Sequence, residues 1–380
     1  MKVRLGDYIQ EYSARNKSDE DIPVYSVTNT QGFCRDYFGK EVASKDKSTY
    51  KVVPKGYFAY NPSRINVGSV DWQRNEEKVI VSPLYNVFSV SYQLDQQYLY
   101  YYLKSDVALH FIKAVAAGSV RDNLKFDMLC DFYITLPSVH EQRNIVQRLD
   151  KVKDLIRMKQ EALKMYDDLI KARFVELFGN PDINEQKWEI CKLEALCDVG
   201  SSKRIYQSEQ SLTGIPFLRI SDLINRMDNG SLDCHLFIPE TQYEELKEQG
   251  LVPQSGDILL TARGTLGRCY IVKEDDEFYF QDGMITWLSN YDSRVTPLYI
   301  SYLFEMPGFR KQIDALQEGS TVAYLSIAMA KKLDVMVPSM DVQNQFADFV
   351  KQVDKSKVVL ENILTKYHKI DLITCIQAGL

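Results

Sequence analysis

Two stretches of this sequence, ITLPSVHEQRNIVQRLDKV (134–152) and VMVPSMDVQNQFADFVKQV (335–353), share one pattern. In both, a short apolar run ends at a proline, and a polar segment then opens a long helical pattern. The two prolines, Pro137 and Pro338, lie 201 residues apart. This spacing indicates an internal repeat, and a repeat decides the fold because each copy adopts the same kind of structure.

The same spacing persists upstream of the prolines. It pairs Tyr98 with Tyr299, Gly118 with Gly319, Leu124 with Leu325 and Met128 with Met329. Further upstream the register drifts, since Ile22-Pro23 matches Ile215-Pro216 with a smaller offset, as loop insertions produce. The chain is therefore one unit of about 200 residues written twice, with most positions diverged.

The part of each unit before the proline predicts a mixed α/β module. Short runs rich in β-branched and aromatic residues, separated by Gly, Asn, Asp and Pro, predict strands at 57–60, 78–90, 257–262 and 278–288. Amphipathic spacing predicts helices over 95–115 and 297–316. The fold class is therefore α/β of the mixed α+β kind.

The part after each proline predicts a long helix with apolar residues at heptad spacing. The predicted seam consists of Ile145, Leu149, Val152, Ile156, Leu163, Tyr166, Ile170 and Leu177 in the first copy, and of Phe346, Val350, Val353, Leu360, Leu364 and Tyr367 in the second. Each helix is roughly 50 Å long. Two such stripes bury each other most economically; the alternative is that each packs on its own module.

These patterns divide the chain into four parts. They are a first module (1–138), a central helix (139–180), a second module (181–338) and a C-terminal helix (339–380). The Gly, Asn and Pro of FGNPDINEQKW (178–188) are typical of a helix end and mark the start of the second module.

Composition narrows the class of protein. The 380 residues contain no apolar run of about 18, and the N-terminus lacks the apolar stretch of a signal peptide, so we expect a soluble, intracellular protein without a membrane partner. The seven cysteines form no C-x-x-C pair. We expect free thiols in a reducing compartment, and neither a disulfide framework nor a zinc site.

Several phrases, taken in order, resemble one known family. They are LPSVHEQRNIVQRLD (136–150), FVELFGNP (174–181), WEICKLEALCDV (188–199), IPFLRISDL (215–223) and GDILLTARGTLGRCYIV (256–272). With the duplication, they make the whole chain similar to the specificity (S) subunits of type I restriction-modification systems, the HsdS family. The N-terminal copy, with VRLGDYI, IPVYSVTN and KGYFAYNPSRINVG, departs more from the family phrases.

The resemblance implies a fold and a function. Each module would be a target-recognition domain that reads one half of a bipartite, asymmetric DNA site, and the two helices would form an antiparallel coiled-coil spacer with pseudo-two-fold symmetry. The chain would be a non-catalytic, cytoplasmic subunit. Its partners would be double-stranded DNA, two methyltransferase (M) subunits and, through them, the restriction (R) subunits. S-adenosylmethionine, ATP and magnesium would belong to those partners.

A scaffold that binds only proteins, with two interaction modules on a coiled-coil spacer, is the alternative from another class. The net charge of −6 suits it. Divided by region, however, the charge is +1 in residues 1–138, +2 in 139–180, −9 in 181–338 and zero in 339–380. The acidity thus belongs to the second module, and we expect basic partner subunits to complete DNA binding.

Candidate DNA contacts are the polar and basic residues of three pairs of loops, since base edges and phosphates are bound by such side chains. The first choices are Asn61, Ser63, Arg64, Arg263 and Thr265 in NPSRINVG (61–68) and TARGTLG (261–267). The second pair, GSVRDNLK (118–125) and GSTVAYL (319–325), supplies Ser119, Arg121, Asn123, Lys125, Ser320, Thr321 and Tyr324. The third supplies Lys203 and Arg204, opposite Arg15 and Lys17, and Arg219 is a further basic candidate.

Each candidate has a structural alternative. Arg263 equally suits an ion pair, Ser119 and Ser320 equally suit helix capping, and the third loop pair suits a solvated surface better than a DNA contact. The tyrosines at 98–102 suit a core better than base stacking.

Signals of catalysis are weak. Asn61-Pro62-Ser63-Arg64 lacks the second proline and the aromatic residue of adenine methyltransferases, and Asp182 with Glu185-x-Lys187 lies in a helix-exit linker rather than on nuclease strands. There is no Walker A sequence, and the four histidines are isolated. We expect no active site and no metal site in this chain.

Overall fold

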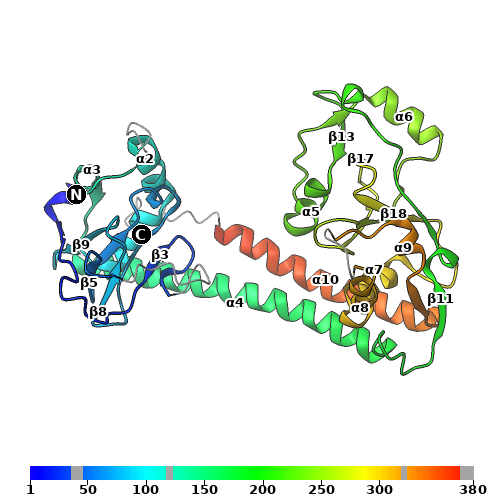
Figure 1. The fold of residues 1–380 in the computed structure, drawn as a ribbon, viewed down its shortest axis with the longest axis horizontal. Coiled ribbons are helices and arrows are strands. Elements are labelled where there is room, and N and C mark those ends of the chain that lie inside the picture. Colours follow the sequence, from blue (N-terminus) through cyan, green and yellow to red (C-terminus); the bar gives the residue numbers. More distant parts are fainter. Residues whose placement is uncertain (36–45, 117–122, 318–322, 369–380) are drawn as a thin grey trace. The chain divides into compact units, whose positions relative to one another are not determined.

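A computed structural model describes residues 1–35, 46–116, 123–317 and 323–368 (Figure 1). The chain divides into two compact units, one of Met1–Gln160 with Glu361–Leu380 and one of Glu161–Leu360. Each unit is described by itself below. No described helix is both long enough and apolar enough to cross a membrane.

The first unit has a four-stranded antiparallel sheet in the order β2-β9-β6-β7. Its strands are β1 (Lys2–Arg4), β2 (Ile9–Glu11), β3 (Ser26–Thr28), β4 (Gly32–Cys34), β5 (Lys51–Pro54), β6 (Phe58–Tyr60), β7 (Val70–Trp72), β8 (Lys78–Val81), β9 (Asn86–Val90) and β10 (Tyr133–Thr135). Its helices are α1 (Gln96–Lys104), α2 (Asp106–Ala116), α3 (Phe126–Cys130) and the start of α4 (Val139–Phe178), with short 3-10 turns at Leu5–Asp7 and Ile65–Val67. Strand β1 pairs with β10, β3 with β4 and β5 with β8.

The second unit has a sheet of the same kind, in the order β12-β18-β15-β16. Its strands are β11 (Glu189–Lys192), β12 (Asp198–Gly200), β13 (Ile215–Leu218), β14 (Phe237–Ile238), β15 (Ile258–Thr261), β16 (Cys269–Ile271), β17 (Tyr279–Phe280), β18 (Ile285–Ser289) and β19 (Asp334–Val337). Its helices are the end of α4, α5 (Ile220–Asn229), α6 (Glu240–Glu248), α7 (Pro297–Glu305), α8 (Pro307–Ala315), α9 (Ile327–Lys331) and most of α10 (Met340–His368), with 3-10 turns at Leu193–Ala195 and Gln207–Glu209. Strand β11 pairs with β19, and β13 lies between β14 and β17.

The two units repeat one plan, which confirms a mixed α/β fold written twice. Strands β2, β9, β6 and β7 take the places of β12, β18, β15 and β16, and the pair β1-β10 takes the place of β11-β19. Helices α1, α2 and α3 correspond to α7, α8 and α9 at the spacing of 201 residues found in the sequence.

The predicted helices 95–115 and 297–316 are wrong in one respect, because each is broken into two. Ser105 is extended (φ −71°, ψ 150°) between α1 and α2, and its Oγ accepts from the Ala108 amide as a cap of the second helix. Met306 is extended in the same way because Pro307 follows it, and a residue before proline avoids the helical region. The hydrophobic spacing continues across each break, so periodicity alone did not show it.

A buried glutamine joins each long helix to its module. The Gln142 amide nitrogen donates to the carbonyls of Gln93 and Pro137, and its oxygen accepts from the Asp95 amide. Gln343 makes the same three bonds, to Arg294, Pro338 and Thr296. Both side chains are almost fully buried. This bonding pattern fixes the first turn of α4 and of α10 against the loop that precedes α1 and α7.

The first turns of α4 pack into the core of the first unit. Ser138 and Glu141 cap its start, since the Ser138 amide and hydroxyl donate to the Glu141 carboxylate. Ile145 and Leu149 belong to the core that contains Tyr98, Tyr101 and Leu129. This part of the helix therefore packs on its own module, as the alternative interpretation of the seam proposes. Tyr98, Tyr101 and Tyr102 of α1 are buried core residues and are not available for base stacking.

The last turns of α4 lie against α10 inside the second unit (Figure 1). Phe174 and Phe178 of α4 contact Phe346 of α10, with ring centroids 5.5 and 5.4 Å apart, and both also contact Tyr299 of α7. Further along, Lys357 of α10 pairs with Asp167 of α4. Positions rise along one helix as they fall along the other, so these segments run antiparallel.

The predicted seam needs one correction at this end. Ile170, Phe174 and Phe178 are fully buried, whereas Leu177 is only partly buried. The buried side chains here recur every fourth residue because a straight α-helix drifts from a strict heptad, and the large phenylalanine rings reach the core. Arg173, which interrupts the predicted seam, stacks its guanidinium over the Phe349 ring at 5.7 Å.

The side chains at the other seam positions are buried to differing degrees. Val350 and Val353 are buried in the core of the second unit, and Tyr166 packs against it. Val152, Ile156, Leu163 and Leu360 are half-buried. The side chains of Leu364 and Tyr367 lie outside the described residues.

Candidate functional site

In the second unit, the loops predicted to contact DNA meet around the turn Gln281–Met284, which joins β17 to β18. The Gly283 amide donates to the Ser201 hydroxyl at 3.3 Å, and the Ala262 amide donates to the Met284 carbonyl at 2.9 Å. The Gln281 amide donates to the Leu218 carbonyl at 2.9 Å, next to Arg219. Three segments that are distant in the sequence thus share one turn.

The loop after α8 adds a fourth segment. The Leu325 amide donates to the Ala262 carbonyl at 3.0 Å, and Arg263 and Tyr324 face each other in an antiparallel bridge. The Arg263 guanidinium lies over the Tyr324 ring, 5.1 Å from its centroid. In the described parts of the chain Arg263 has no ion pair, so the structural alternative proposed for it finds no support there.

The other candidates of the second unit that the structure describes, Lys203, Arg204, Arg219 and Thr265, are exposed. Arg204 pairs with Asp282 of the turn (Nε···Oδ2 2.8 Å), while Arg219 pairs with Asp222 in α5 at 3.4 Å. The backbone of Lys203 bonds to the Tyr279 hydroxyl, and its side chain is exposed. Thr265 is exposed at the tip of the loop after β15.

In the first unit, the loop after β6 is joined to the loop before α3 in the same way. The Leu124 amide donates to the Pro62 carbonyl at 3.1 Å, as Leu325 does to Ala262. This bond holds the segment of Asn123 and Lys125 against the start of the loop that carries Ser63 and Arg64. Lys125 and Arg64 are exposed, and Asn123 is half-buried. In each unit, one loop of the first predicted pair is therefore joined to one loop of the second predicted pair.

Asn61 has a role within its own loop. Its side-chain oxygen accepts from the Ser63 amide at 3.1 Å and from the Ser63 hydroxyl at 2.9 Å. Thr261, at the equivalent place, donates its hydroxyl to the Thr265 carbonyl and accepts from the Arg268 amide. Both residues hold the shape of the loop, so the exposed candidates are the residues at its tip.

Other candidates fall elsewhere. Ser119, Arg121, Ser320 and Thr321 lie outside the described residues, so both interpretations of them stay open. Arg15 and Lys17 are exposed, and the backbone of Arg15 pairs with Lys51 at the edge of β5. That edge belongs to another sheet than the Asn61 loop does.

The sequence interpretation missed Gln281 and Asp282, which lie at the centre of the surface. A usable signal was present, because QDG between two apolar runs is typical of a turn between strands. Only the parallel pairing of β13 with β17 shows that this turn reaches Arg219.

Buried tyrosines support both surfaces from below. The Tyr60 hydroxyl donates to the Leu124 carbonyl and accepts from the Asn86 amide. The Tyr279 hydroxyl accepts from the Lys203 amide. Burial raises the pKa of both phenols above the usual value, so both stay neutral at physiological pH. Asp228 of α5 accepts a hydrogen bond from the Arg268 guanidinium, and this bond lowers the pKa of the Asp228 carboxyl.

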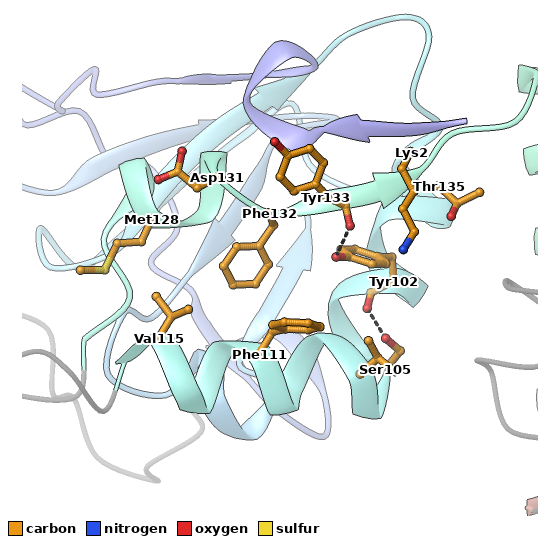
Figure 2. A pocket seen from close by; sticks show the side chains of 11 residues that line it. Lys2, Tyr102, Ser105, Phe111, Val115, Met128, Asp131, Phe132, Tyr133 and Thr135 are labelled. Carbon is orange, nitrogen blue, oxygen red and sulfur yellow. Dashed lines mark hydrogen bonds between the residues drawn. The ribbon is translucent and has the colours of Figure 1, made fainter.

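The first unit also has a pocket of about 510 Å³ that lies between α2, α3 and β10 (Figure 2). Phe111 and Tyr133 are among the residues that line it, and both side chains are exposed; Figure 2 shows the Phe111 ring facing it from α2. Their counterparts in the second unit are Gln312 and Asp334, which bond to each other through the Gln312 side chain and the Asp334 backbone. No candidate DNA contact among the described residues lines the pocket, so it is separate from the surface described above.

The described residues include no group of three or more His, Cys, Asp or Glu side chains that could hold a metal ion. The six described cysteines are free thiols. Burial raises the pKa of Cys197 to about 12, so this thiol stays protonated.

Comparisons with known proteins agree with this architecture. The family model of the type I restriction modification DNA specificity domain matches residues 5–165 and again residues 185–370. Two specificity subunits of type I restriction enzymes are similar to the chain. A putative one from Haemophilus influenzae, S.HindORF215P, is 27% identical over 71% of this chain and 66% of its own length. The MjaVIII specificity subunit from Methanocaldococcus jannaschii is 23% identical over 93% of this chain and 85% of its own length.

Solved structures share the fold. A chain from a study of complex assembly and conformational transition of the type I restriction-modification system has a TM-score of 0.62 at 15% identity, covering 100% of this chain and 97% of the other. The S subunit from M. genitalium has a TM-score of 0.51 at 14% identity, with 100% and 96% covered.

The fold and its loop surfaces define a protein built from two copies of a DNA specificity domain. The chain belongs to the type I restriction-modification specificity subunits, the HsdS family, whose function is DNA sequence recognition. It is a non-catalytic subunit.

Proposed function

We propose that this chain recognises one asymmetric, bipartite DNA sequence, with one half-site read by each module. The observation that carries the proposal is the equivalent joining of two loops in both units, through Leu124 to Pro62 and Leu325 to Ala262. This shared framework presents different side chains, Ser63 with Asn123 in one unit and Arg263 with Tyr324 in the other. Because the two modules share one loop framework but carry different side chains at the loop tips, they suit two half-sites of different sequence.

The helices α4 and α10 would act as an antiparallel coiled-coil spacer that sets the gap between the half-sites, with the modules related by a pseudo-two-fold axis. The antiparallel contacts of Phe174 and Asp167 with α10 support this pairing. At 40 residues, α4 is about 60 Å long, enough to separate half-sites about one DNA turn apart.

The partners would be two methyltransferase subunits and, through them, the restriction subunits. S-adenosylmethionine, ATP and magnesium would be bound by those partners, in the cytoplasm, and none by this chain. Exposed apolar side chains along α4 support a docking face for a partner helix, since exposed apolar surface marks interaction sites. They are Leu155, Met158, Met165 and Leu169, with 42, 60, 70 and 47% of their surface exposed.

Methylome sequencing of cells that carry the complete system tests the proposal. We expect one asymmetric methylated motif with two specified parts and an unspecified gap of fixed length. Deleting the gene for this chain should abolish methylation of that motif. A continuous motif, or methylation that persists after the deletion, would contradict the proposal.

A further inference from the structure

One arginine of the second module differs from the others in its contacts. The module has seven arginines, and six bond to acceptors: Arg204 to Asp282, Arg219 to Asp222, Arg226 to Asp276, Arg268 to Asp228, Arg294 to Asp292, and Arg310 to the carbonyls of Leu266 and Phe304. Arg263 has no such acceptor among the described residues. Its guanidinium therefore keeps its donors available to a ligand.

The loop that carries Arg263 is built to hold its tip in place. Thr261 is completely buried, and its hydroxyl donates to the Thr265 carbonyl at 2.6 Å and accepts from the Arg268 amide at 3.0 Å. Gly264 and Gly267 have φ of +72° and +73°, which other residues adopt only with strain. The loop is thus fixed at its base, while Arg263 to Thr265 are exposed.

Tyr324 orders the arginine itself. Its amide donates to the Gln317 side-chain oxygen at 2.8 Å, and Leu325 is bonded to Ala262 beside it. The ring then lies 5.1 Å from the Arg263 guanidinium carbon. Stacking on an aromatic face restrains a guanidinium without using its N–H donors. Less side-chain entropy is lost when a ligand binds to an arginine that is already ordered.

A planar guanidinium with free donors has one preferred partner in a DNA groove. It donates two parallel bonds to O6 and N7 of guanine, the commonest specific contact in the major groove. The equivalent positions in the first module are Ser63 and Asn123, which cannot form this fork. At these two equivalent positions, only the second module therefore offers a guanidinium fork to guanine.

We propose that Arg263, ordered by Tyr324, reads one guanine in the half-site of the second module. Arg263 is the specificity-determining residue at that base pair, and Tyr324 is a positioning residue. The inference rests on the proposed function, because it requires that the second module binds DNA.

The test uses the complete complex with the variants Arg263→Lys and Arg263→Ala. Lys247→Ala, in α6, is the control because it removes one positive charge from the exposed surface of the same module. The motif of each variant is determined by methylome sequencing. We expect preference for guanine at one position of one half-site to fall about tenfold to hundredfold in both Arg263 variants, with the other half-site and the Lys247→Ala motif unchanged.

Duplex binding by the purified complex provides a second measurement. Replacing the relevant guanine by 7-deazaguanine, which lacks N7, should weaken binding by the natural protein but not by Arg263→Ala. Tyr324→Phe should keep the preference, and Tyr324→Ala should reduce it. An unchanged motif in Arg263→Ala, or a natural protein insensitive to 7-deazaguanine at every guanine of both half-sites, overturns the inference. If the natural protein specifies no bipartite motif at all, the proposed function fails instead.

Discussion

At the scale of single residues, the buried glutamines Gln142 and Gln343 show how side chains that contact no ligand determine the architecture. Each buried side chain bonds to two backbone carbonyls and one backbone amide, so its own polar atoms are satisfied. Leaving a buried polar group unsatisfied costs about 1–3 kcal/mol. A glutamine at this place thus fixes the exit of a long helix from a module.

Replacing Gln343 by leucine should destabilise the second module by about 2–4 kcal/mol, because three backbone groups lose their partner. Gln345→Leu, an exposed change two residues along α10, is the matched control and should have an effect within about 0.5 kcal/mol. Urea denaturation monitored by tryptophan fluorescence measures both variants. Equal midpoints for the two variants would show that the bonds of Gln343 contribute nothing to stability.

At the scale of elements, the repeat in the sequence predicted that the same arrangement of strands and helices occurs twice in the chain. It could not reveal the break at Ser105, because the apolar spacing continues across it. The heptad pattern predicted two long helices, but not that Phe174 and Phe178 replace Leu177 as the buried residues of α4. Which face of a helix is buried depends on the module beside it, and the Gln281 turn is brought next to Arg219 by the pairing of β13 with β17, which the sequence pattern does not show.

The length of α4 and α10 should control the distance between the half-sites. Inserting seven residues into each helix, in register, lengthens the pair by about 10 Å. The preferred gap in the methylated motif should then grow by about three base pairs, at about 3.4 Å per base pair. Substituting seven residues at the same places, without changing the length, is the control. An unchanged gap after the insertion would exclude a spacer role.

At the scale of the whole molecule, the charge distribution indicates that this chain selects the DNA sequence while other subunits supply most of the positive charge that binds DNA. The second module carries −9, and most of its arginines are already paired with carboxylates. Few cations of this module are left to displace counterions from DNA. The chain is therefore suited to choosing a sequence within an assembly whose other members supply positive surface.

The isolated chain should bind its own bipartite duplex much more weakly than the complex with methyltransferase subunits does. Its affinity should also fall less steeply with salt, because fewer phosphates are neutralised. Fluorescence anisotropy between about 50 and 200 mM salt measures both slopes. A duplex with both half-sites scrambled is the control. If the affinities of the isolated chain and of the complex fell equally steeply with salt, the partner subunits would not be the source of the additional phosphate contacts.

The pairing of the first and last strands has a consequence for synthesis on the ribosome. Strand β1 pairs with β10 through Lys2 and Thr135, and β11 pairs with β19 through Glu189 and Val337. Neither module can close its edge until its final strand has been translated, since such non-local contacts form late and slowly. The first module can close while the second is still being made, so the chain should fold co-translationally in two successive steps.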